Sequence, residues 1–116
     1  MNIQVIGTKK NNDTRKAERF FKERRVPFQF VDLKERPLSE GELKNISSAV
    51  PVDELIDTES REYEKKGLSY MEFDIFEELL ENNFLLKLPI VRNGQRATVG
   101  YDPETWNTWI EEGSAS

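Results

Sequence analysis

Residues 3–17, IQVIGTKKNNDTRKA, set the architecture of the chain. The apolar run Ile3–Ile6 predicts a short, mostly buried strand. Gly7 and the polar residues after it predict a connection to a helix that begins near Asp13 or Thr14, with Asn12 or Asp13 as the capping side chain. The stretch therefore predicts a strand that passes directly into a helix.

The helix that follows has an apolar face formed by Ala17, Phe20 and Phe21. Pro27 is expected to end it, because the residue before a proline is pushed out of the helical region. Residues Phe28–Val31 then predict a second strand. A β-α-β unit this short implies a right-handed crossover and a parallel pair of strands.

The middle of the chain is predicted to be mostly helical. Ser39 and Glu42 have the spacing of a capping box, and the apolar Leu43 and Ile46 follow them. Pro51 is expected to interrupt the helical pattern.

Two further stretches before the third strand are predicted to be helical. Residues 52–63 are charged and loosely helical, with Leu55 and Ile56 as the buried candidates. Residues 71–80 carry apolar side chains at helical spacing and predict the clearest helix of this region. Its four glutamates are interpreted as a solvated helix face rather than an acidic site: Glu72, Glu77, Glu78 and Glu81.

In the last third of the chain, the spacing of apolar residues changes from the helical period to that of strands. Ile90–Arg92 and Arg96–Val99 flank the dipeptide Asn93-Gly94, which predicts a β-hairpin with a type I′ turn. Asparagine and glycine favour this turn because both of its central residues need positive φ angles.

Residues 100–103 are expected to lead into a last helix, with Pro103 near its first turn. Trp106 and Trp109 lie on its apolar face, and we expect one of them in the core and the other partly exposed. Residues 113–116 are predicted to form a frayed, flexible tail.

Composition limits the class of protein. The 116 residues predict one domain, residues 1–112, in which charges of both signs are mixed and the net charge is -5. This balance argues against direct binding of nucleic acid, which needs a concentrated basic face. With no basic segment followed by a long apolar run, we expect no signal peptide, no membrane span and a cytoplasmic location.

The sequence contains no cysteine and no histidine. Thiol chemistry is therefore excluded. A zinc or copper site is not expected, because only carboxylates and carbonyls remain as ligands. No metal and no cofactor is predicted.

The order β-α-β, helical insertion, β-β-α resembles the ArsC/Spx family, which contains glutaredoxin-dependent arsenate reductases and Spx-type transcription regulators of bacteria. The resemblance runs almost from end to end and implies an α/β, thioredoxin-like fold with a mixed sheet of about four strands. Its motifs are Ile3–Ile6 before the turn, Asp13–Ala17, Asp53–Ile56 through Tyr63 and Gly67-Leu68, Leu88–Val91 and Val99–Glu104. It implies that Pro89 follows a cis peptide bond.

The resemblance also implies that the family chemistry is lost. The nucleophilic cysteine of the family falls at Asn11, just before a helix N-terminus that would lower the pKa of a thiol. The three arginines that clamp arsenate fall at Asp57, Leu88 and Asp102, none of which can hold an oxyanion as arginine does. Arsenate reduction by this chain is not expected.

The resemblance to the regulators of the family concerns a redox switch and two residues that contact a partner. Their CxxC redox switch falls at Asn11 and Thr14, so redox switching is impossible. The glycine and arginine with which they contact the RNA polymerase α-subunit fall at Pro51 and Glu59.

These observations give three hypotheses. The leading one is a non-catalytic binding or regulatory module with an unknown protein partner. The second is a glutaredoxin-dependent reductase whose natural or related forms carry cysteine at position 11, with glutathione and glutaredoxin as partners. The third is a small-anion-binding protein that uses the first helix N-terminus. Its candidate residues are Lys10, Asn11, Asn12, Asp13, Thr14 and Arg15.

Overall fold

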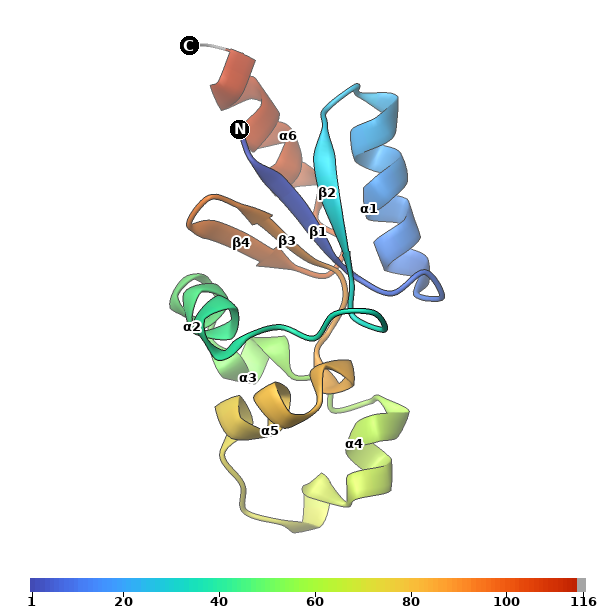
Figure 1. Ribbon diagram of the computed structural model, residues 1–116, viewed down its shortest axis with the longest axis vertical. Helices are drawn as coiled ribbons and strands as arrows, with labels where there is room; N and C mark the ends of the chain where they lie inside the picture. Colours follow the sequence, from blue (N-terminus) through green and yellow to red (C-terminus); the bar gives the residue numbers. More distant parts are fainter. Residues whose placement is uncertain (115–116) are drawn as a thin grey trace.

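The computed structural model describes residues 1–114 and contains a four-stranded mixed sheet (Figure 1). Its strands are β1 (Ile3–Gly7), β2 (Phe28–Asp32), β3 (Ile90–Asn93) and β4 (Arg96–Val99), in the spatial order β2-β1-β3-β4. β1 and β2 are parallel, whereas β3 is antiparallel to both β1 and β4. The predicted α/β class, the parallel first pair and the hairpin are confirmed.

Two helices, α1 (Asn12–Glu23) and α6 (Pro103–Ser114), cover one face of the sheet (Figure 1). The layer is aromatic, since Phe20 and Phe21 of α1 both pack edge-on or tilted against Trp106 of α6. Both tryptophans of α6 are buried, so the expectation that one would be partly exposed is wrong. The indole N–H of Trp106 donates to the hydroxyl of Thr98, 2.8 Å away, which satisfies its one polar group.

Helix α1 differs from the prediction at both ends. It begins at Asn12, and its capping residue is Asn11 rather than Asn12 or Asp13. It ends at Glu23, before Pro27, because Arg25 adopts a left-handed φ of 57° and the amide of Val26 turns back to the carbonyl of Phe21 at 2.9 Å.

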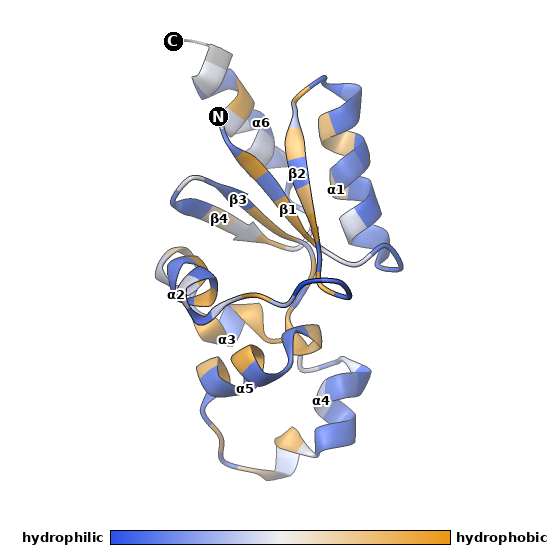
Figure 2. Ribbon diagram, in the orientation of Figure 1, coloured by the Kyte–Doolittle hydropathy of each residue, from blue (hydrophilic) through white to orange (hydrophobic). Residues whose placement is uncertain are grey.

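A helical insertion between β2 and β3 packs against the other end of the sheet and extends the molecule to 48 Å (Figure 1). The insertion consists of α2 (Glu40–Ala49), α3 (Val52–Leu55), α4 (Arg61–Lys66), η1 (Leu68–Tyr70), α5 (Ile75–Glu81) and η2 (Asn83–Leu85). In Figure 2, α2, α3 and α5 carry apolar stretches, whereas α4 is hydrophilic along its length. The second apolar cluster lies between the insertion and the sheet, where it includes Ile6, Val31 and Ile90 of the strands.

The capping box at the start of α2 is present as predicted. Residues 52–63 are not one loose helix, because the chain between α3 and α4 pairs with the segment before β3. The amide of Asp57 donates to the carbonyl of Leu85, and the amide of Lys87 donates to that of Leu55, both at 2.7 Å. This bridge cannot form with residues 56 and 57 in a helix.

Helix α5 is shorter than the predicted helix over 71–80. Asp74 caps it, since its Oδ1 accepts from the amide of Glu77 at 3.0 Å, and residues 71–73 therefore stay outside the helix.

The hairpin turn also differs in detail. Asn93 pairs with Arg96, so Gly94 and Gln95 form the two-residue loop. Of these two loop residues, Gly94 has a positive φ of 62° and Gln95 does not have a positive φ. A type I′ turn needs a positive φ at both loop residues. A type II′ turn needs a positive φ only at the first, where glycine is typical.

Helix α6 continues through Gly113 to Ser114, whereas residues 115–116 of the expected tail lie outside the described part of the chain. Within residues 1–114, every helix is too short or too polar to span a bilayer.

Candidate functional site

Asn11 ends the turn between β1 and α1 and is the residue to which the resemblance assigns the thiol of the family. Its Oδ1 accepts two hydrogen bonds, from the amide of Thr14 at 2.8 Å and from the hydroxyl of Thr14 at 2.9 Å. Its own amide donates to the carbonyl of Thr8 at 3.2 Å. The side chain is thus a helix cap, and an amide group has no nucleophilic chemistry to replace that of a thiolate.

Thr14 is fully buried, with 0% of its surface exposed. A Cβ on Gly7 would lie 2.7 Å from Cγ2 of Thr14 and closer still to its Oγ1. Only glycine therefore permits β1 to approach α1 this closely. Because its hydroxyl is enclosed and already donates to Asn11, Thr14 is excluded as a nucleophile.

The other anion-site candidates lie on the exposed side of the same turn. Lys10 is exposed, the carboxylate of Asp13 lies 3.9 Å from Nζ of Lys16, and Arg15 donates to Oδ1 of Asn12. A hollow of about 300 Å³ lies here, lined by Asn12, Arg15, Lys16 and Arg19. The site thus gathers several cations, but Asp13 also brings a negative charge to the helix N-terminus.

The three positions to which the resemblance assigns the arginine clamp carry side chains that make structural contacts. Oδ1 of Asp57 accepts from the amide of Glu59 at 3.0 Å, which closes a tight turn before α4. Asp102 caps α6 by accepting from the amide of Thr105 at 3.2 Å and from its hydroxyl at 2.8 Å. Leu88 is half-buried and packs against the apolar cluster of the insertion.

Leu88 precedes Pro89, and the peptide bond between them is cis, the conformation that the resemblance implies. Pro89 is buried, and its carbonyl accepts from the amide of Gly100 at 2.9 Å.

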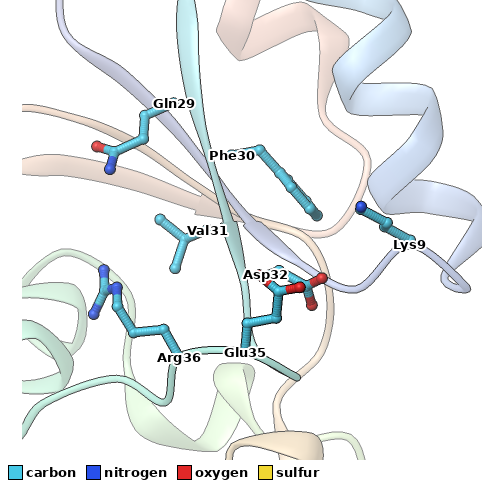
Figure 3. A pocket seen from close by; sticks show the side chains of 7 residues that line it. All are labelled: Lys9, Gln29, Phe30, Val31, Asp32, Glu35 and Arg36. Atoms are coloured by element: carbon cyan, nitrogen blue, oxygen red, sulfur yellow. The ribbon is translucent and has the colours of Figure 1, made fainter.

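A second hollow, of about 230 Å³, runs along the free edge of β2 (Figure 3). Lys9 and Phe30 lie on one side of the strand, and Gln29, Val31 and Arg36 lie on the other (Figure 3). Its charged lining is balanced, since Lys9 and Arg36 are matched by Asp32 and Glu35. It therefore adds no net positive charge to the turn at Asn11.

The pair Arg36–Glu42, at the start of α2, is an interaction that spacing did not reveal. The guanidinium of Arg36 donates to both carboxylate oxygens of Glu42, at 2.8 and 3.0 Å. This hydrogen bonding lowers the pKa of Glu42 to about 2, and the carboxylate raises the pKa of Arg36. Glu42 also accepts from the amide of Ser39 at 3.0 Å.

Among residues 1–114, no three or more carboxylates lie together in a metal-ligating arrangement.

The comparisons with known proteins agree with the resemblance to the ArsC/Spx family. The sequence model of the ArsC family matches residues 6–109. The global transcriptional regulators Spx 1 of Oceanobacillus iheyensis and Spx of Bacillus subtilis are each 30% identical over 95 residues, 78% of this chain and 72% of theirs.

Solved structures of related proteins share the thioredoxin-like fold. A YFFB protein has a TM-score of 0.82 at 19% identity, and the match covers 91% of this chain and 96% of the YFFB chain. An arsenate reductase from Vibrio cholerae has a TM-score of 0.78 at 20% identity, with 90% and 94% covered. With the family model matched over most of its length, the chain belongs to the ArsC family.

Proposed function

We propose that this chain is a non-catalytic member of its family that acts as a regulatory module by binding another protein. One observation carries the proposal: the residue at the nucleophile position is a helix cap whose Oδ1 accepts two hydrogen bonds from Thr14. The position has a structural function, and the chain contains no cysteine to supply the reaction from elsewhere.

The former clamp supports the same proposal. Asp57 closes a turn, Asp102 caps α6, and Leu88 packs in an apolar cluster. Arginine at any of these positions would lose the contact that the present side chain makes. The four substitutions thus form a consistent set, in which each binding or reacting group has been replaced by one that stabilises the fold.

The regulatory part of the proposal comes from the relatives. The proteins that are 30% identical to this chain are global transcriptional regulators. The expected partner is therefore a protein, although Pro51 and Glu59 replace the two residues that the resemblance assigns to contact with RNA polymerase.

An arsenate reduction assay with glutathione and glutaredoxin tests the loss of catalysis. The wild-type chain should show no turnover above the blank. The variant Asn11→Cys should gain a thiol that reacts with alkylating reagents but should still not reduce arsenate, because the clamp is absent. Asn12→Cys, one residue further along the same helix start, is the matched control for thiol reactivity alone.

Turnover by the wild type, or by Asn11→Cys, would contradict the proposal and favour the reductase hypothesis. Affinity capture from a lysate of the native host, with RNA polymerase subunits among the proteins examined, tests the binding part. A bait of unrelated sequence but equal net charge is its control, and enrichment no greater than with that bait would argue against a partner.

The small-anion hypothesis is the second candidate, and the hollow beside Arg15, Lys16 and Arg19 favours it. Titration with phosphate and arsenate, followed by amide chemical shifts, would support it if residues 11–15 shift in a saturable way. Shifts spread evenly over the basic surface would exclude it.

A further inference from the structure

The negative charge of the protein is concentrated in one part of the helical insertion. Residues 67–86 contain no lysine or arginine and five carboxylates, which matches the net charge of the whole chain, -5. The five are Glu72, Asp74, Glu77, Glu78 and Glu81.

The same segment exposes large apolar side chains. Tyr70 is 93% exposed, Met71 is 52% exposed and Phe84 is 40% exposed. Only two other large apolar side chains of residues 1–114 are exposed, Met1 and Tyr101. A surface that is both acidic and apolar differs from an ordinary solvated helix face, which would keep such side chains covered.

A groove between α5 and the start of α2 combines these two properties. Its volume is about 590 Å³. Phe76 and Leu80, one helical turn apart on α5, supply its apolar lining and pack partly against the core beneath. Glu77 of α5 and Glu40 of α2 contribute exposed carboxylates to the lining.

The cations of the protein neutralise only part of this charge. Lys66 pairs with Glu78 and, at 3.2 Å, with Glu81, and its pKa is raised by both carboxylates. Lys44 lies 4.0 Å from Glu40. Glu77 has no ion-pair partner among the described residues, so the groove keeps a net negative charge.

We infer that this groove binds a positively charged amphipathic helix of the partner protein. The apolar side of such a helix would contact Phe76 and Leu80, since apolar residues one turn apart on one helix match those on another. Its lysines or arginines would face Glu40 and Glu77, which gives charge complementarity. The inference rests on the proposed function, because it names the class of partner that the module would recognise.

Binding of a labelled model peptide, measured by fluorescence anisotropy, tests the inference. The peptide has roughly 18 residues of lysine and leucine, arranged so that leucines form one face of a helix. We expect saturable binding by the full chain, weakened by salt because the attraction is partly electrostatic.

The double variant Glu40→Gln/Glu77→Gln should weaken binding about five-fold, since each exposed pair contributes a modest share of the free energy. The matched control Glu23→Gln/Glu111→Gln removes the same charge from exposed positions on α1 and α6 and should weaken it by less than about two-fold. Equal weakening by the two variants would mean attraction to net charge alone and would overturn the inference.

A peptide with serine in place of leucine tests the apolar contact and should bind at least about ten-fold more weakly. Equal binding of the two peptides would overturn the inference, as would peptide-induced amide shifts centred outside α2 and α5.

This outcome is separable from the proposed function. If the peptide fails to bind while the chain still captures a specific protein, the groove is wrong and the regulatory function stands. If the wild type reduces arsenate, the proposed function fails whatever the peptide does.

Discussion

The starts of α1 and α6 use the same local arrangement in different surroundings. In both, a capping side chain accepts from the amide and the hydroxyl of a threonine three residues later: Asn11 through Oδ1 alone with Thr14, and Asp102 through Oδ1 and Oδ2 with Thr105. Thr14 is enclosed against Gly7, whereas Thr105 is only partly buried. The hydrogen bonds are alike, so the difference in burial should determine how much each one stabilises the fold.

The largest expected effect comes from removing the close approach at α1. Gly7→Ala should lower the free energy of unfolding by about 3 kcal/mol, because the added methyl group overlaps the buried side chain of Thr14. Urea denaturation followed by the fluorescence of the two buried tryptophans measures it. In the double variant with Thr14→Ala the two effects should not add, and full additivity would show that no such clash exists.

The two caps should differ when each is deleted. Asn11→Ala should cost about 2 kcal/mol, because it leaves the buried hydroxyl of Thr14 without its acceptor as well as removing the cap. Asp102→Ala should cost about 1 kcal/mol, because water can reach Thr105. The same urea titration compares them, and a larger cost at Asp102 would reverse the comparison.

The start of α2 extends the comparison to a third, more exposed cap, and adds a dependence on pH. The pKa of Glu42 is about 2 in the folded chain, below its ordinary 4.5. Its bonds to Arg36 and Ser39 therefore stabilise the fold fully above about pH 4.5, and this stabilisation disappears as the pH falls toward 2.

We expect the loss at Glu42 to be about 1–2 kcal/mol after allowance for solvent screening. Glu42→Gln can still make the capping box but not the ion pair, so its unfolding free energy should change less between pH 5 and pH 2. Identical pH profiles for wild type and variant would show that the pair contributes nothing.

The smallest effect is expected from removing one hydroxyl at a time. Thr14→Val should cost about 1 kcal/mol and Thr105→Val only about 0.3 kcal/mol, because the second hydroxyl can be replaced by water at the surface. Thermal unfolding of the two variants is a sufficient comparison, and equal shifts in the midpoint would mean that burial does not separate the two helix starts.

Local sequence signals predicted the four strands, the capping box of α2 and a last helix with Pro103 near its start, because each depends on residues close together in the chain. The prediction for the start of α1, near Asp13 or Thr14, is one or two residues too late, since the helix begins at Asn12. Asn11, Asn12 and Asp13 can all cap a helix, and the choice is made by the packing of Thr14 on β1.

The insertion was harder to predict, because its shape depends on distant contacts. Apolar spacing extended α5 back to Met71, but the cap at Asp74 overrides it. The segment after α3 leaves the helix because Asp57 pairs with Leu85, far along the chain. The family resemblance assigns former reaction groups to four positions, which stays a prediction, and only the structure gives the present contacts of those residues.

The bridge between Ile56 and Leu86 has a consequence for how such a protein can change. The bridge joins the two ends of residues 57–85, so these residues form a closed segment whose ends are held together by the backbone and whose Leu68, Leu79 and Leu85 pack in the core. Doubling the length of a flexible loop costs only about 0.6 kcal/mol of closure entropy. The exposed residues 70–72 of this segment can therefore be exchanged or lengthened at little cost to the sheet, provided that Leu68, Leu79 and Leu85 stay in the core, and one scaffold could carry different recognition surfaces at the same anchor.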